Sequence, residues 1–238
     1  MDDIWNMEQQ KGELPYLGNK CWLDVTRDER YFCAELFFQL KRSDVRSAFL
    51  AQINRSFIGE PIDALNTNAE HWEVGLEVAF YRDSIHALGF EGEHHIRRLP
   101  QFSQKRTFDL CLFSKERLVI IEAKSFMGLE TKQLQEFADD RGDIALLLKD
   151  RAPEVILIGL WSSAYQPRKE LRSGAGKKHT GVVPLFNGHM HWRDLCDLPG
   201  IDEPSRRIFS LADATKRRDR GQVPSWENHV ASWKAPNP

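Results

Sequence analysis

Asp109, Glu122 and Lys124 are charged residues at the ends of two apolar segments in the stretch FDLCLFSKERLVIIEAK, residues 108–124. Two carboxylates and a lysine are the groups that metal-assisted hydrolysis of a phosphodiester bond requires. Carboxylate oxygens suit Mg²⁺, which binds one or two carboxylates and keeps water or substrate phosphate as its other ligands. A neighbouring lysine can neutralise developing charge or orient the attacking water. This chemistry requires the three side chains to lie close together in the fold.

The two apolar segments, residues 107–113 and 118–124, predict antiparallel strands joined at Ser-Lys-Glu-Arg. In the simplest register Asp109 faces Glu122, and directly opposed residues have Cβ atoms about 4.5–5.5 Å apart. Lys124 shares this face because it follows Glu122 by two residues. Opposed carboxylates repel each other, and a divalent cation between them would remove this penalty. The register therefore predicts a metal site at the open end of a rigid hairpin.

Asp109, a spacer of twelve residues and the triplet Glu122-Ala123-Lys124 at the end of an apolar strand resemble the motif of the PD-(D/E)XK nuclease superfamily. That superfamily includes many restriction endonucleases, resolvases and repair or defence nucleases. Phe108 stands where the motif has proline. The resemblance implies that Asp109 and Glu122 bind Mg²⁺ or Mn²⁺ and that Lys124 assists the attacking water. It also implies the backbone carbonyl of Ala123 as a further ligand.

The resemblance implies a restriction endonuclease-like α/β fold, whose αβββαβ core is a mixed sheet flanked by helices. Apolar periodicity predicts this order of elements along the chain. The predicted elements are a helix at 69–88, a weak strand near 93–99, the hairpin, a helix at 131–149 and a strand at 154–161. We expect residues 1–66 to form an N-terminal helical extension and residues 67–238 to form the nuclease-like domain.

Local signals predict further structure on both sides of this core. Thr26-Arg-Asp-Glu29 has the form of a capping box, in which Glu29 reaches back to the start of its own helix. Asn187-Gly188 between the segments 182–186 and 189–192 predicts a C-terminal two-residue β-hairpin. A polar tail follows, with a short helix predicted near residues 208–218.

Glu77 is a candidate fourth acidic group of the site. Many members of the superfamily carry a glutamate on the first core helix, and Glu77 lies on the apolar stripe of the helix predicted at 69–88. A carboxylate there is costly unless it is paired or binds a metal. Glu73, one turn earlier on the predicted helix, is the alternative candidate for this acidic group. The alternative explanation for Glu77 itself is a solvated or salt-bridged side chain without a role in the site.

A basic segment beyond the predicted core is a candidate phosphate-binding loop. Its cations have few acidic neighbours, and such a loop beside a nuclease core can bind phosphates. A solvated loop without function explains the composition equally well. We expect His94, His95, His189 and His191 to be surface residues, because Cys/His partners at zinc spacing are absent from the sequence. The cations of the loop are Arg168, Lys169, Arg172, Lys177 and Lys178.

The overall composition is that of a soluble cytoplasmic protein. The 33 basic and 35 acidic residues nearly cancel, so a nucleic-acid-binding surface would have to be local. The apolar runs are far shorter than the roughly 20 residues of a membrane span. The four cysteines are scattered without a Cys-x-x-Cys pair, and we expect buried free thiols in a reducing cytosol.

These observations predict a Mg²⁺- or Mn²⁺-dependent nuclease acting on DNA, in a restriction, defence or repair context. A homodimer, or a partner protein bound through the N-terminal helical segment, fits this function. Two alternatives stay open: a nuclease-like subunit that binds nucleic acid or takes part in an assembly without cleavage, and a nuclease acting on RNA.

Overall fold

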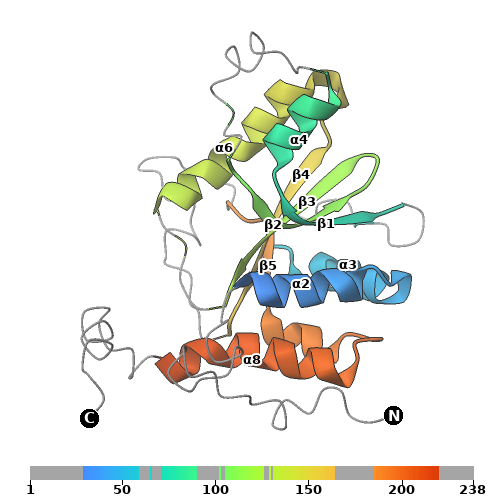
Figure 1. Cartoon of the computed structure of the whole chain (residues 1–238), viewed down its shortest axis with the longest axis vertical. Coiled ribbons are helices and arrows are strands. Elements are labelled where there is room, and N and C mark those ends of the chain that lie inside the picture. The colour runs from blue at the N-terminus through green and yellow to red at the C-terminus, as the bar shows by residue number, and fades with distance from the viewer. Residues whose placement is uncertain are drawn as a thin grey trace, which may run out of the picture.

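The computed structural model describes residues 29–58, 65, 71–89, 102, 105–125, 129, 131–163 and 185–219, without the side chains of residues 131, 132 and 214–219. Within these residues the chain forms a mixed α/β structure, in which helices flank both faces of one sheet (Figure 1). The five strands are adjacent in the order in which they occur along the chain. They are β1 Glu73–Val78, β2 Phe108–Phe113, β3 Arg117–Lys124, β4 Glu154–Trp161 and β5 Gly188–His191.

Strands β2 and β3 form the predicted antiparallel hairpin. Leu110 pairs with Ile121, and Phe113 pairs with Leu118 next to the turn, so the predicted register is confirmed. The hydroxyl of Ser114 accepts a hydrogen bond from the Arg117 N–H at 3.1 Å, which closes the connection between the strands. The register follows from the sequence because a shift by one residue would move every apolar side chain to the opposite face.

Strand β4 runs parallel to β3, and α6 Thr131–Leu148 forms the connection between them. A parallel pair requires such a crossover, because its two strands begin at the same edge of the sheet. The predicted helix at 131–149 and strand at 154–161 are therefore confirmed. α6 lies on the same face of the sheet as α4 Phe80–Ala87 (Figure 1).

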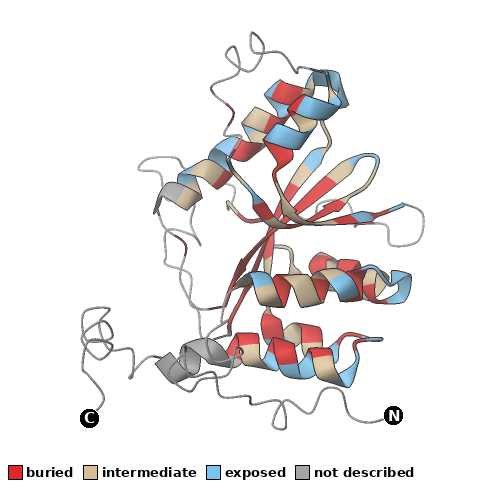
Figure 2. Ribbon diagram, in the orientation of Figure 1, coloured by how far each residue is buried: buried red, intermediate tan, exposed pale blue. Residues whose placement is uncertain are grey.

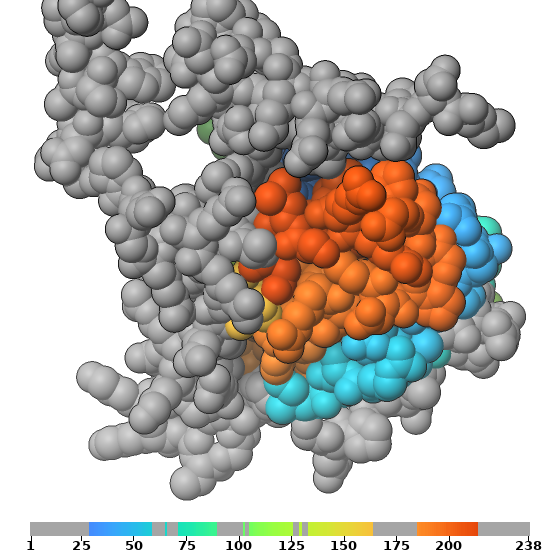
Figure 3. All heavy atoms as spheres, turned by 90° about the horizontal axis from the view of Figure 1, so that it is seen from below, coloured from blue at the N-terminus to red at the C-terminus, as the bar shows by residue number. Residues whose placement is uncertain are grey.

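Helices α2 Glu29–Leu40 and α3 Ser43–Ser56 cover the opposite face. Below them lie the short 3₁₀ segment η3 Trp192–Asp197 and α8 Glu203–Asp219, and Figure 3 shows this face with α3 beside them. A buried amide connects α2 to α8: Gln39 Nε2 donates to Ser205 Oγ at 2.8 Å and to Asp202 Oδ2 at 3.1 Å. This contact holds α2 in a fixed position below the sheet.

Two apolar clusters fill the spaces on the two faces of the sheet. Strand β3 contributes to both clusters and is buried from Leu118 to Lys124, as the central red strands of Figure 2 show. Burying a Leu, Ile or Val side chain fully stabilises a fold by about 1.5–3 kcal/mol. A charged side chain at the end of β3 is therefore held by a rigid core on both sides.

The prediction of a helix at 69–88 is wrong. Residues Glu73–Val78 form β1, which pairs with β2, and only Phe80–Ala87 are helical. Val74 and Val78 are four residues apart, but Leu76 between them completes an alternation that fits a strand equally well. Gly75 disfavours a helix, and pairing with β2 decides between the two periods.

The predicted hairpin at Asn187-Gly188 is also wrong. Gly188 begins β5, which runs parallel to β4, and the Asn187 side chain accepts the Leu157 N–H at 2.9 Å. A Cβ atom on Gly188 would lie 2.6 Å from the carbonyl oxygen of Ser56, so close approach of α3 requires glycine here. The segment 182–184 and the strand predicted near 93–99 lie outside the described residues.

Helices α2 and α3 belong to the apolar cluster on one face of the sheet, together with Leu110 and Ile158. The described part of the predicted N-terminal extension therefore contributes directly to the core. A domain boundary at residues 66 and 67 stays a prediction. In the described parts of the chain, no helix has the length and apolar character needed to cross a membrane. Cys33 and Cys111 are buried free thiols, as expected, whereas the free thiol of Cys196 is only partly buried, and Cys21 lies outside the described residues.

Candidate functional site

Asp109 lies near the start of β2, and its side chain reaches across to β3. Its Oδ2 atom accepts a hydrogen bond from the backbone N–H of Ala123 at 2.8 Å. Ala123 lies between Glu122 and Lys124, so the Asp109 carboxyl is placed beside both predicted partners. The structure therefore brings together the three residues singled out from the sequence.

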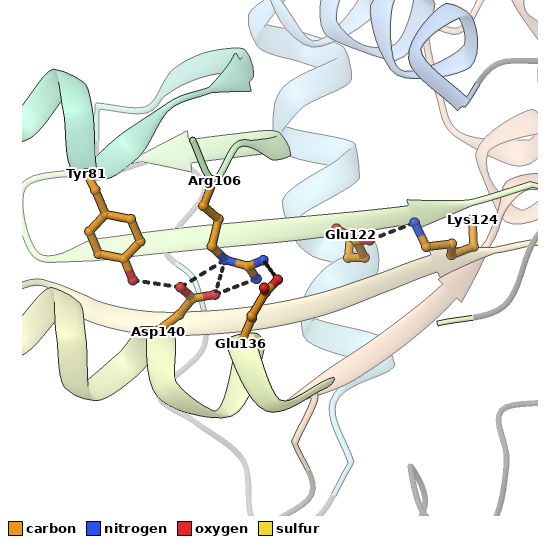
Figure 4. A network of polar contacts seen from close by, with 6 residues as sticks. All are labelled: Tyr81, Arg106, Glu122, Lys124, Glu136 and Asp140. Atoms are coloured by element: carbon orange, nitrogen blue, oxygen red, sulfur yellow. Dashed lines mark hydrogen bonds and ion pairs between the residues drawn. The ribbon is translucent and has the colours of Figure 1, made fainter. Parts of the chain in front are cut away.

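Glu122 and Lys124 form a buried ion pair at the end of β3 (Figure 4). Lys124 Nζ lies 2.7 Å from Glu122 Oε1, and the two residues are only 7% and 5% exposed, respectively. They are two residues apart on one strand, and so point to the same side of the sheet. The core of the sheet thus holds both charged groups in one arrangement.

Glu29, the first described residue of α2, joins this site from a position 95 residues before Lys124 in the sequence. Its Oε2 lies 3.3 Å from Lys124 Nζ, and its Oε1 accepts the Ser125 N–H at 3.1 Å. Thr26 lies outside the described residues, so the capping box stays a prediction, but the Glu29 carboxylate has partners at the end of β3 that this motif did not predict. Sequence reasoning missed this site residue because a local motif had already explained the glutamate. We call Glu29, Asp109, Glu122 and Lys124 the carboxylate cluster.

The backbone at the end of β3 is fixed by contacts with later parts of the chain. The carbonyl oxygen of Lys124 accepts hydrogen bonds from Ser162 N at 3.0 Å and from Trp192 Nε1 at 3.3 Å. Trp192 is fully buried and packs against Phe32 and Phe209. The position of the Lys124 side chain thus depends on η3 and α8 as well as on the hairpin.

The carboxylate cluster contains three acids and one lysine, and its electrostatics reflect this imbalance. Burial and the neighbouring charge of Asp109 raise the pKa of Glu122 to about 8, although Lys124 acts in the opposite direction. Burial also raises the pKa of Asp109 and of Glu29. Burial acts to lower the pKa of Lys124, but Glu122 and Glu29 outweigh it and the net shift is upward. Lys124 therefore stays charged, whereas the ionised form of each carboxylate is unfavourable in this buried site.

Glu77 does not lie on a helix, contrary to expectation. It is part of β1, and its neighbours Leu76 and Val78 pair with Leu110 and Phe108, which places Glu77 opposite Asp109. Its φ of 49° lies in the left-handed region that residues other than glycine rarely adopt. Its Oε1 lies 3.5 Å from Arg30 Nε, so Glu77 is near the cluster but paired with an arginine.

The alternative, Glu73, lies at the other end of β1 and is exposed. Its Oε1 atom is 3.8 Å from His71 Nε2 at the surface. Glu73 is therefore excluded as the fourth acidic group of the site, whereas the metal-binding role of Glu77 stays a prediction.

The donor chemistry of the cluster fits Mg²⁺ or Mn²⁺. Asp109 and Glu122 supply hard oxygen ligands, and Mg²⁺ needs only one or two carboxylates when water and phosphate complete its shell. The Ser125 hydroxyl beside them is buried and has no hydrogen-bond partner among the described residues, so it can accept or donate to a bound water. The described residues contain no group of three or more His, Cys, Asp or Glu side chains placed to hold a metal. The Ala123 carbonyl remains a predicted ligand.

A second polar network lies farther along the sheet (Figure 4). The Arg106 guanidinium donates to both carboxylate oxygens of Asp140, with Nη2–Oδ2 at 2.7 Å, and to Glu136 Oε2 at 2.8 Å. Tyr81 Oη donates to Asp140 Oδ1 at 2.6 Å. We call Tyr81, Arg106, Glu136 and Asp140 the arginine cluster. Sequence reasoning missed it because its members come from three separate segments.

The remaining candidates are not part of the described site. The basic loop with Arg168, Lys169, Arg172, Lys177 and Lys178 lies outside the described residues, as do His94 and His95. His189 and His191 are on β5, with ring centroids 5.7 Å apart. The ring centroid of His189 lies 5.9 Å from that of Trp161. Trp161 is on β4, the strand that lies between His189 and β3.

Comparison of the chain with family models, with curated proteins and with solved structures finds no match. Function is therefore inferred from the geometry of the site.

Proposed function

We propose that this protein is a Mg²⁺- or Mn²⁺-dependent nuclease of the PD-(D/E)XK type that hydrolyses phosphodiester bonds in DNA. The observation that carries the proposal is the convergence of Asp109, Glu122 and Lys124 at the end of the hairpin. The raised pKa values of the buried carboxylates beside a charged lysine support the proposal, because functional sites often shift the pKa values of their side chains.

The order of elements supports this proposal. Among the described elements, α2, β1, β2, β3, α6 and β4 occur in the order αβββαβ that the resemblance implies, with α3 between α2 and β1 and α4 between β1 and β2. In this arrangement the first helix of the core would be α2 at residues 29–40, and not the segment 69–88 that the sequence predicts. Helices α3, α4 and α8, the 3₁₀ segments and strand β5 are additions to the pattern.

The residues of the site have separate roles in this mechanism. Asp109 and Glu122 would hold the cation, which when bound polarises the scissile phosphate and promotes ionisation of the attacking water. Lys124 Nζ orients this water and stabilises the negative charge that develops at the phosphate. Glu29 positions Lys124 and keeps its charge, because its carboxylate on α2 lies 3.3 Å from Nζ in addition to that of Glu122. The buried core around β3 prevents these groups from moving apart.

Cleavage of DNA with and without Mg²⁺ tests this proposal. We expect the full-length protein to cut supercoiled plasmid, and Lys124→Ala and Asp109→Asn to lose activity by about 100-fold or more, the cost of removing one strong transition-state contact. Asp139→Asn is the matched control, because Asp139 is an exposed carboxylate on α6. Equal cutting by all four proteins would overturn the assignment, and RNA competition separates the two substrates.

A second candidate function follows from the 2.7 Å contact between Glu122 and Lys124. This ion pair partly neutralises the site without a metal, which favours a nuclease-like subunit that binds nucleic acid and does not cleave it. Thermal melting with Mn²⁺ distinguishes the two functions. For a metal-dependent enzyme we expect stabilisation by about 2.7 kcal/mol when Mn²⁺ is at 100 times its Kd.

This stabilisation should be larger at pH 8 than at pH 6, because protons compete with the cation for carboxylates whose pKa values are raised. Asp109→Asn should not respond to Mn²⁺, whereas Asp139→Asn should respond as the unmodified protein does. An unmodified protein whose melting is independent of Mn²⁺ at both pH values would favour the non-catalytic subunit.

A further inference from the structure

Arg30 is an exposed cation at the edge of the carboxylate cluster. It follows Glu29 directly in the first turn of α2, and its side chain is 71% exposed. Glu29 contacts Lys124, while Arg30 contacts Glu77, which lies opposite Asp109 on β1. The first turn of α2 therefore places one acid inside the site and one arginine beside it.

The charge of the site makes such an arginine necessary for a polyanionic substrate. Three carboxylates of the cluster face one lysine, and Lys124 is buried between Glu122 and Glu29. A nucleic-acid strand carries a negative charge at every phosphate, and cations must offset its repulsion from the acids. Arginine suits this role because its planar guanidinium binds phosphate oxygens with two parallel hydrogen bonds.

Glu77 is placed to orient this arginine. Its side chain is 34% exposed, and its carboxylate lies 3.5 Å from Nε, the nitrogen nearest the backbone of Arg30. The left-handed backbone of Glu77 is an unfavourable conformation of the kind that is found at functional sites. A contact at Nε restricts the direction of the guanidinium, and the Arg30 side chain remains 71% exposed.

We propose that Arg30 binds a backbone phosphate of the nucleic acid next to the scissile one, and that Glu77 positions its guanidinium. This inference rests on the proposed nuclease function and assigns to Glu77 a role different from metal binding.

Binding of a fluorescein-labelled DNA duplex to full-length Asp109→Asn protein tests the inference, because this variant should bind DNA without cutting it. We expect Arg30→Ala to weaken binding about eightfold at roughly 0.1 M monovalent salt, and to reduce the slope of log K against log salt by about 0.9, as loss of one phosphate contact requires. Arg207→Ala is the matched control. Arg207 is 63% exposed and pairs with Glu203 at 3.4 Å, but lies on α8. Unmodified protein in EDTA provides the same comparison if Asp109→Asn does not fold.

Glu77→Gln distinguishes a positioning role from metal binding. We expect it to change DNA affinity only while Arg30 is present, so that the Arg30→Ala and double variants bind equally, and to leave stabilisation by Mn²⁺ intact. Loss of the Mn²⁺ response in Glu77→Gln would contradict the positioning role.

The outcomes separate the inference from the proposed function. If the protein binds DNA and Arg30→Ala binds with unchanged affinity and salt slope, the inference is wrong and the nuclease proposal stands. If the protein binds neither DNA nor RNA, the proposed function fails, and the inference fails with it.

Discussion

The arginine cluster and the carboxylate cluster contain similar residue types but differ in charge balance. In the arginine cluster Asp140 is 2% exposed, and it accepts hydrogen bonds from Tyr81 and Arg106, whose guanidinium also packs 4.4 Å over the Phe137 ring. The two acids there share Arg106, but separate nitrogens of its guanidinium bind Asp140 and Glu136. In the carboxylate cluster, three acids share Lys124.

This difference indicates separate purposes for the two clusters. A buried network in which each polar group is satisfied stabilises one arrangement of the chain, here α4 against α6. An arrangement that keeps three carboxylates around a single lysine is costly in the free protein, because the carboxylates repel one another. We infer that the arginine cluster serves the fold and that the carboxylate cluster serves chemistry.

Removing the arginine should have the largest effect on stability. We expect Arg106→Ala to lower the free energy of unfolding by about 3–5 kcal/mol, because Asp140 and Glu136 would be left without their cation. Urea denaturation measures this loss. The control Arg193→Ala should cost less than about 0.5 kcal/mol, since Arg193 is 60% exposed and 4.0 Å from Asp194. A loss below about 1 kcal/mol for Arg106→Ala would contradict the structural role.

Neutralising an acid of the carboxylate cluster should raise the free energy of unfolding at high pH, in contrast to the loss expected for Arg106→Ala. The pKa of Glu122 rises from 4.5 to about 8 in the folded protein, so the folded state binds the proton more tightly than the unfolded state. Stability should therefore fall as pH increases from about 4.5 to 8, by an amount on the order of a few kcal/mol, and then level off.

Glu122→Gln should remove most of this pH dependence and be more stable than the unmodified protein at pH 9 without metal. Urea denaturation across this pH range measures the effect. Glu203→Gln is the control, because Glu203 is an exposed carboxylate on α8, and it should retain the slope. A metal-free protein whose stability is constant from pH 5 to 9 would remove the distinction between the clusters.

Two hydroxyl deletions provide the smallest and most direct comparison. Ser125 Oγ is buried without a hydrogen-bond partner among the described residues, so Ser125→Ala should leave stability unchanged or raise it by about 1 kcal/mol. Tyr81→Phe removes a hydroxyl that donates to Asp140 and should cost about 1–2 kcal/mol. Thermal melting at one pH measures both. Equal losses for the two variants would mean that the Ser125 hydroxyl is satisfied in solution.

Local patterns predicted the parts of the fold in which neighbours in sequence are neighbours in space. The register of the β2–β3 hairpin, α6 and the buried strand β4 follow from apolar periodicity and a short turn. The segment at Glu73–Val78 fits both a helix and a strand, and only pairing with β2 decides between them. Asn187-Gly188 is typical of a hairpin turn, but the Asn187 side chain binds the backbone of β4 instead. Gly188 lacks a Cβ atom, which allows the close approach of α3.

The meeting of Asp109, Glu122 and Lys124 can be predicted from the sequence, because pairing along a hairpin follows from counting residues from one turn. The residues that surround them depend on the tertiary structure. Glu29 reaches Lys124 from 95 residues away, Trp192 holds the carbonyl of Lys124 from 68 residues away, and Glu77 turns to Arg30. No local periodicity encodes these contacts, because they depend on how α2, η3 and β1 pack around the end of β3.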